Sequence, residues 1–135
     1  MAEVAVVGAG VIGLSVAREL ARAGLTDVLI LEREAAVARG STSRANGGFR
    51  AQFTTRPNIE LSRFSIDELE RLEAETGLCS LRQVGYLLMT GTEEGERGLR
   101  AAVRLQRSLG VPTEWLSPEE VLAKAGLTVE AIRRY

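Results

Sequence analysis

The feature that most constrains this chain is a glycine-rich turn, GAGVIG, at residues 8–13. The apolar run before it, residues 4–7, is typical of a strand, and the pattern after it predicts a helix from Val11 to about Ala23. A second apolar run, residues 28–31, ends at Glu32, 19 residues after the last glycine of the turn. Together these features predict a βαβ unit that binds an adenine dinucleotide, FAD or NAD.

Each glycine of the turn has its own role in this chemistry. Gly8 permits the tight turn out of the strand, Gly10 lets a pyrophosphate approach the backbone, and Gly13 lets the helix pack closely on the strands. The N–H groups at the start of the helix, with those of Val11 and Ile12 among them, would face the phosphates.

Glu32 is the candidate partner of the ribose. Its carboxylate would accept hydrogen bonds from the adenosine ribose hydroxyls and would repel a 2′-phosphate, so NADP is disfavoured. One other interpretation stays open, in which the turn belongs to an ordinary α/β domain and Glu32 is a solvated strand end.

Composition excludes several classes of protein. The 135 residues suffice for one domain, and a net charge of −1 gives no reason to expect nucleic acid or a membrane surface as a partner. No apolar run reaches the roughly 18 residues of a membrane span, so no transmembrane segment is expected. The single cysteine, Cys79, cannot form an internal disulfide, which favours a cytoplasmic protein. The chain has no histidine and no cysteine cluster, so we predict no metal site.

Downstream of Glu32 the pattern predicts further helices and strands. Ser43 could cap a short helix over residues 44–46. A longer helix is expected from Pro57 to about Thr76, ended by Gly77. One face of that helix carries Leu61, Phe64, Leu69 and Leu72. The remaining expected elements are a strand at 84–89, a helix at 93–109, a short strand at 113–116 and a helix that begins after the N-cap Ser117.

A second motif, GSTSRANGGFRAQF, occupies residues 40–53. Small and hydroxylated residues at this distance after the acid suit a loop that lines the phosphates and ring of a flavin. In this motif the chain resembles the D-amino-acid oxidase superfamily of FAD-dependent oxidoreductases. Within it, the chain looks most like the group of the sarcosine oxidase β-subunit and dye-linked L-proline dehydrogenase. Residues 58–62, 84–87 and 114–117 also look like that group.

The resemblance implies a role for each part of this loop. Arg33, together with Glu32, would hold the adenosine side of FAD. The residues that would offer donors to the phosphate and ribityl groups are Ser41, Thr42, Ser43 and Arg44, and those that would approach the flavin ring are Asn46, Gly47 and Gly48. Arg50 aligns with an arginine that helps to hold the substrate carboxylate, a role that suits a bidentate guanidinium. The alternative for Arg50 is a surface or ion-paired arginine.

The fold implied is α/β, a Rossmann-like βαβ FAD-binding unit with additional helices and strands, in an incomplete domain. Residues 1–135 would be the N-terminal FAD-binding portion, with the βαβ unit at 3–32, the flavin loop at 40–53 and the start of an inserted region at 57–135. Because members of the family continue well beyond this length, we expect a fragment, a truncated reading frame or a subunit that a second chain completes. FAD would be bound noncovalently, since the chain has no histidine and Cys79 lies outside the cofactor motifs.

The function implied is oxidation of a small amine or amino acid, of the sarcosine, proline or glycine kind, with hydride transfer from the carbon beside nitrogen to the flavin. Two alternatives remain. An NAD-binding dehydrogenase domain would share residues 3–32 but would leave the 40–53 motif unexplained. A truncated nucleotide-binding chain without turnover would bind FAD weakly or not at all.

Overall fold

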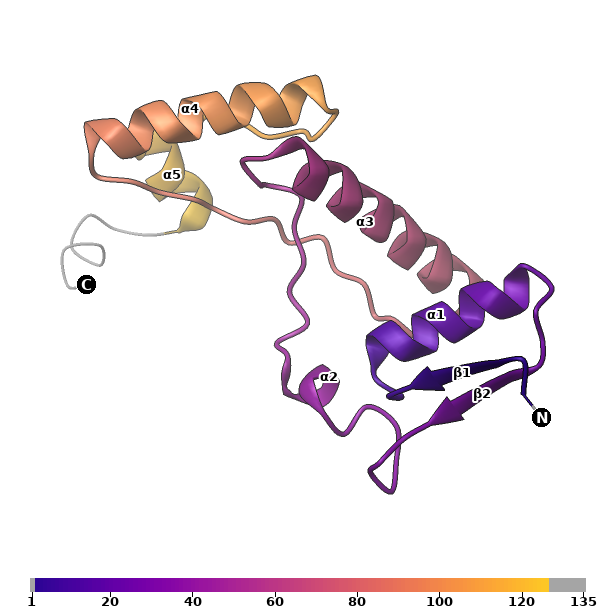
Figure 1. The fold of residues 1–135 in the computed structure, drawn as a ribbon. Coiled ribbons are helices and arrows are strands. Elements are labelled where there is room, and N and C mark those ends of the chain that lie inside the picture. Colours follow the sequence, from indigo (N-terminus) through magenta and orange to yellow (C-terminus); the bar gives the residue numbers. More distant parts are fainter. Residues whose placement is uncertain (1, 127–135) are drawn as a thin grey trace. The chain divides into compact units, whose positions relative to one another are not determined.

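The computed structural model of this chain describes residues 2–126, and the chain divides into two compact units, residues 1–48 and 49–135. The architecture is mixed α/β, with one small parallel sheet in the first unit (Figure 1). The last part of the region predicted at 57–135, residues 127–135, lies outside the described residues.

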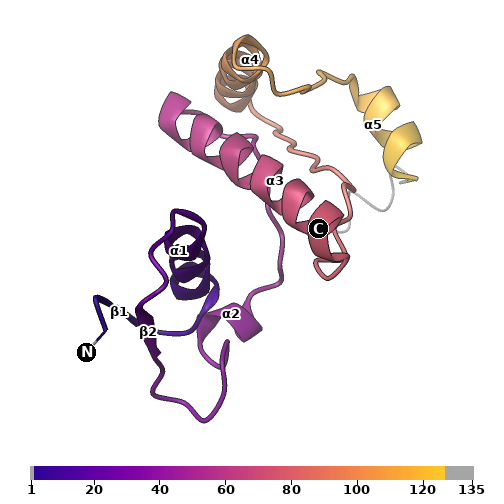
Figure 2. The same cartoon turned by 90° about the vertical axis from the view of Figure 1, so that its right-hand side faces the viewer.

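The first unit is built on a strand, a helix and a second strand, as predicted. Strand β1 (Val4–Val7) and strand β2 (Val28–Leu31) pair in parallel, with Val4 opposite Val28 and Val7 opposite Leu31. Helix α1 (Val11–Arg22) connects them and lies over one face of the pair (Figures 1 and 2). A parallel pair needs such a crossover, because the chain must return to the same end of the sheet.

Helix α2 (Ser41–Arg44) begins earlier than the sequence predicted. Its N-cap is Gly40, so the prediction that Ser43 caps a helix over residues 44–46 is wrong. The reason is that Ser43 lies inside α2, where its hydroxyl bonds to a preceding carbonyl and not to the N–H groups of a following helix. The hydroxyl donates to the Gly40 carbonyl at 3.2 Å, and the Ser43 N–H donates to the Ala38 carbonyl.

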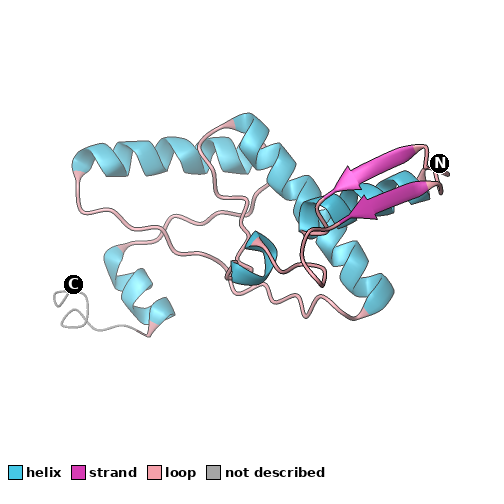
Figure 3. Cartoon of the chain, turned by 60° about the horizontal axis from the view of Figure 1, so that its bottom comes forward, coloured by secondary structure: helices cyan, strands magenta, loops and turns pink. Residues whose placement is uncertain are grey.

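The described part of the second unit, residues 49–126, contains three helices joined by long loops (Figure 3). They are α3 (Arg56–Thr76), α4 (Glu93–Ser108) and α5 (Pro118–Ala125). All three were expected from the sequence. Helix α3 ends at Gly77, which adopts the left-handed conformation with φ of 67°. Its fully buried residue is Ile59, whereas Leu61 and Phe64 on the expected apolar face are largely exposed.

The two additional strands predicted for this unit are absent from the described residues. Residues 84–89 and 113–116 are irregular. Gly85 has a φ of 77°, which interrupts an extended chain, and the Tyr86 carbonyl accepts a hydrogen bond from a side chain instead of a neighbouring strand. Apolar composition favours a strand, but a strand also needs a paired neighbour, which the local sequence does not supply.

Neither a membrane-spanning helix nor a cluster of metal ligands occurs within residues 2–126. No helix there combines the length and the apolar character needed to cross a membrane. The same residues bring together no group of three or more histidine, cysteine or carboxylate side chains that could hold a metal ion.

Candidate functional site

The glycine turn between β1 and α1 leaves no room for larger residues at one of its positions. A Cβ at Gly13 would overlap the carbonyl oxygen of Gly8, so this glycine allows α1 to begin directly against the end of β1. Gly8 itself has a φ of 100°, a conformation that side-chain-bearing residues rarely adopt. Its N–H donates to the Leu31 carbonyl at 2.8 Å, which ties the turn to the end of β2.

The N-terminus of α1 offers backbone donors. The Val11 N–H donates to the Thr42 hydroxyl oxygen at 3.0 Å. Within residues 2–126, the N–H groups of Ile12 and Gly13 have no hydrogen-bond acceptor. A Cβ at Gly10 would lie 3.0 Å from the same Thr42 oxygen. Free N–H groups and the positive end of the helix dipole make this a suitable position for an anion.

Glu32 follows β2 and lies against the glycine turn. Its carboxylate accepts from the Glu34 N–H at 3.0 Å and from the Ala9 N–H at 2.8 Å. These two hydrogen bonds hold the pKa of Glu32 below its ordinary value of 4.5. The bond from the Glu34 N–H has the larger effect. The carboxylate is therefore ionised at neutral pH. It retains lone pairs that can accept from further donors, such as ribose hydroxyls.

The rest of the predicted cofactor loop follows α2. Thr42 is the loop residue that the structure connects directly to the glycine turn. The Asn46 side chain accepts from the Gly48 N–H at 3.1 Å, and Gly47 between them has a φ of 71°, so residues 46–48 form a tight turn. The side chains of Ser41, Ser43 and Arg44 are exposed, as is that of Arg33, which pairs with Glu34 at 3.2 Å.

Arg50, the predicted substrate residue, belongs to the second unit. Its guanidinium carbon lies 5.1 Å from the centroid of the Phe53 ring and 5.9 Å from that of Tyr86. Gln106 of α4 binds the same segment, because its side-chain nitrogen donates to the Phe53 carbonyl at 2.9 Å. Sequence reasoning missed Tyr86 and Gln106, since nothing local in the sequence indicates that either lies near Arg50.

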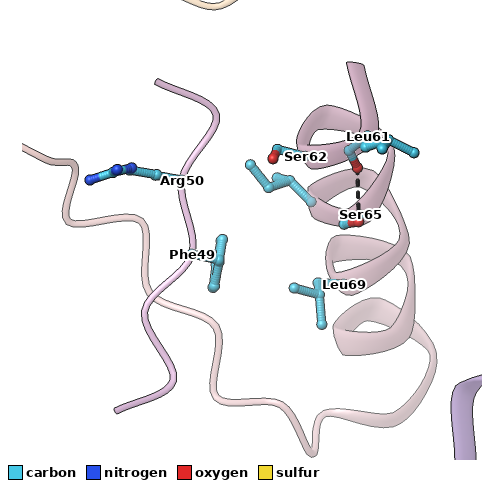
Figure 4. A pocket seen from close by; sticks show the side chains of 7 residues that line it. Phe49, Arg50, Leu61, Ser62, Ser65 and Leu69 are labelled. Carbon is cyan, nitrogen blue, oxygen red and sulfur yellow. Dashed lines mark hydrogen bonds between the residues drawn. The ribbon is translucent and has the colours of Figure 1, made fainter. Parts of the chain in front are cut away.

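A pocket of about 150 Å³ lies between the segment that carries Arg50 and helix α3. It is lined by Phe49, Arg50, Leu61, Ser62, Ser65, Ile66 and Leu69. Figure 4 shows Phe49 on the side that faces α3, whereas the Arg50 guanidinium extends to the opposite side of the backbone. The pocket is therefore mainly apolar, and the cation of Arg50 is directed away from it.

The fold and the glycine turn have the form of a dinucleotide-binding βαβ unit, and comparison with known protein families indicates which dinucleotide the family uses. The family described as DAO, FAD dependent oxidoreductase, matches residues 3–134. The chain therefore belongs to this family of FAD-dependent oxidoreductases. Membership favours FAD over NAD as the ligand of the unit. No solved structure matches the chain.

Curated relatives agree with this assignment. FAD-dependent oxidoreductase domain-containing protein 1 of Bos taurus is 35% identical over 133 residues, which cover 90% of this chain and 27% of the relative. Mitochondrial dimethylglycine dehydrogenase of Rattus norvegicus is 38% identical over 97 residues, 69% of this chain and 11% of the relative. The 4-methylaminobutanoate oxidase (formaldehyde-forming) of Paenarthrobacter nicotinovorans is 33% identical over 115 residues, 84% of this chain and 14% of the relative.

The chain thus spans about a quarter of the length of the bovine relative. Its residues fit the adenosine and pyrophosphate parts of FAD. Among the described residues, the start of α1 has free N–H donors for a diphosphate, and the Thr42 hydroxyl lies close to the Gly10 backbone there. Glu32 is an ionised acceptor beside this turn.

Proposed function

We propose that this chain forms the FAD-binding part of an oxidoreductase that acts on a small amine or amino acid. The observation that supports it best is the arrangement in the first unit. Free N–H groups at the start of α1 lie beside an ionised carboxylate, which is the donor and acceptor set that a diphosphate and a ribose require.

In this proposal each residue has a role in holding the cofactor. The N–H groups of Ile12 and Gly13 bind the pyrophosphate, and Glu32 accepts from the ribose hydroxyls. Thr42 adds a hydroxyl beside the same helix terminus. Bound FAD would supply the acceptor for a hydride from the carbon beside the amine nitrogen.

The substrate class is proposed from two relatives and one residue. The names dimethylglycine dehydrogenase and 4-methylaminobutanoate oxidase both describe enzymes of methylated amino acids. Such substrates carry a carboxylate, and Arg50 is an exposed guanidinium that can bind a carboxylate through two parallel hydrogen bonds. We assign that role to Arg50, and we place the chain in the group of the sarcosine oxidase β-subunit and dye-linked L-proline dehydrogenase.

Three further parts of the proposal concern the whole protein. FAD is held noncovalently, since no histidine is present and Cys79 lies outside the glycine turn and the 40–53 loop. A second polypeptide, or further residues of a longer chain, completes the substrate site. A cytoplasmic location is proposed from the single cysteine alone.

The test is to identify the nucleotide that the purified chain retains. Acid denaturation should release free FAD, which chromatography separates from FMN and NAD. The variant Gly10→Val should retain no nucleotide but keep its helical circular dichroism, because the added side chain obstructs the pyrophosphate. Release of FMN or NAD, or a flavin that stays attached to peptide, would contradict the proposal.

A further inference from the structure

The guanidinium of Arg50 is held by two aromatic rings from different parts of the second unit. The distances from its central carbon, 5.1 Å to the Phe53 ring and 5.9 Å to the Tyr86 ring, are within the range of about 6 Å in which a ring face attracts a cation. Phe53 lies on the same segment as Arg50, whereas Tyr86 belongs to the irregular segment 84–89. The position of the guanidinium therefore depends on what joins these two segments.

Two glutamine side chains fix the segments. Gln52 donates to the Tyr86 carbonyl at 3.3 Å, which ties the Arg50 segment to residues 84–89. Gln106 donates to the Phe53 carbonyl at 2.9 Å and accepts from the Thr113 hydroxyl at 2.8 Å. Because Thr113 donates to the amide oxygen of Gln106, the amide nitrogen is left to face Phe53.

Gln106 is the one polar side chain found buried among residues 2–126, with 3% of its surface exposed. A buried amide that lacked either bond would be unfavourable, so the pair of bonds specifies a single arrangement of the segment that carries Arg50. Neither Gln106 nor Tyr86 lies next to Arg50 in the sequence. Both reach the segment only through the fold of the second unit.

We propose that Tyr86 and Gln106 are positioning residues for Arg50. The ring of Tyr86 attracts the Arg50 guanidinium, and the Gln106 side chain fixes the backbone of the segment through its hydrogen bond to the Phe53 carbonyl. An arginine whose rotamers are already restricted loses less conformational entropy when it binds a carboxylate. The inference rests on the proposed carboxylate role of Arg50, and neither positioning residue touches the substrate.

The first experiment tests positioning without any ligand. Protons that lie over a ring face shift upfield in a proton NMR spectrum, so the Arg50 Nε–H signal of the full chain should be shifted upfield. Tyr86→Phe should keep the shift because the ring is kept, and Tyr86→Leu should reduce it. An unshifted signal in the wild-type chain, or an unchanged shift in Tyr86→Leu, would overturn the proposal.

The second experiment uses the protein whose substrate site is completed by the remaining sequence or a partner chain. It adds the carboxylate probe N,N-dimethylglycine, with N,N-dimethylethanolamine as the matched amine that has no carboxylate. Tyr86→Leu and Gln106→Met should each weaken dimethylglycine binding about two- to five-fold, the range expected for an exposed cation–ring contact. Tyr86→Phe and the surface control Ser108→Ala should bind as the wild type does.

The outcomes distinguish the carboxylate role of Arg50 from the positioning role of Tyr86 and Gln106. If the wild-type Arg50 signal does not respond to dimethylglycine, the carboxylate role of Arg50 is wrong, and the first experiment still decides the positioning. If the wild type binds but both variants bind equally well, the positioning is wrong and the proposed function stands. Tyr86 is 44% exposed, so Tyr86→Leu tests the proposal even if Gln106→Met fails to fold.

Discussion

Gly13 is the glycine of the βαβ unit at which an added Cβ would have least room. Because a Cβ there would overlap the Gly8 carbonyl oxygen, Gly13→Ala must push α1 away from the end of β1. We expect a loss of about 1–3 kcal/mol in the free energy of unfolding, the usual cost of an overpacked site. Urea denaturation followed by circular dichroism would measure it.

The matched control for this substitution is Gly98→Ala. Gly98 lies inside α4, and a Cβ there would meet no atom within 4 Å. Alanine should therefore stabilise that helix, by about 0.5–1 kcal/mol. An equal change in the free energy of unfolding in the two variants would show that the turn accommodates the Gly13→Ala side chain without strain.

Glu32 makes the first unit sensitive to acid. Its pKa is lowered in the folded chain, so the stabilisation is fully present above the ordinary value of 4.5 and is lost as the pH falls through the lowered folded value. The denaturation midpoint of the first unit should therefore fall with acidification below about pH 4.5. The variant Glu32→Gln should flatten this part of the pH profile.

The same variant tests the ribose role. The substitution removes the charge that strengthens the hydrogen bonds to the ribose hydroxyls, so Glu32→Gln should weaken FAD binding roughly ten-fold or more at neutral pH. Fluorescence quenching of FAD measures the dissociation constant. An unaltered constant would show that Glu32 only stabilises the turn.

At the scale of elements, the stability of helix α5 depends on the capping hydrogen bonds at its N-terminus. Ser117 accepts from the Glu120 N–H, and the Glu120 carboxylate accepts from the Ser117 N–H, which completes a capping box before an eight-residue helix. Ser117→Ala should cost about 1 kcal/mol of local stability. Faster amide hydrogen exchange over Pro118–Ala125 would report it.

Helix α3 supplies the control for that cap. Thr55 is its N-cap residue, but the Thr55 side chain makes no capping hydrogen bond. Thr55→Ala should therefore leave hydrogen exchange in α3 nearly unchanged. If Thr55→Ala accelerated hydrogen exchange in α3 as much as Ser117→Ala does in α5, something other than the capping hydrogen bond would determine both effects.

At the scale of the whole molecule, we predict that the 135-residue chain has no amine-dependent turnover. It covers only 27% of the bovine relative and 14% of the 4-methylaminobutanoate oxidase, so most of those proteins has no counterpart in it. Reduction of an artificial electron acceptor should be absent with sarcosine, L-proline, glycine or D-amino acids. Turnover should appear once the remaining sequence or a partner chain is supplied, whereas robust turnover by the chain alone would contradict this prediction.

The sequence by itself determined the elements whose signals are local. The glycine turn, the helix after it and the two apolar runs predicted β1, α1 and β2, because turn geometry and hydrophobic period are properties of neighbouring residues. Gly77 and Ser117 likewise marked helix boundaries through their own backbone conformation or hydroxyl. The 40–53 motif also indicated a flavin, and the family match agrees.

Only the tertiary structure decided which distant residues meet. The segment 84–89 has the composition of a strand, yet it is irregular because no strand among the described residues pairs with it. Thr42 lies over the N-terminus of α1, and Tyr86 and Gln106 lie around the segment of Arg50. Such contacts join residues tens of positions apart, so their energies depend on the folded backbone and leave no periodic signal in the sequence.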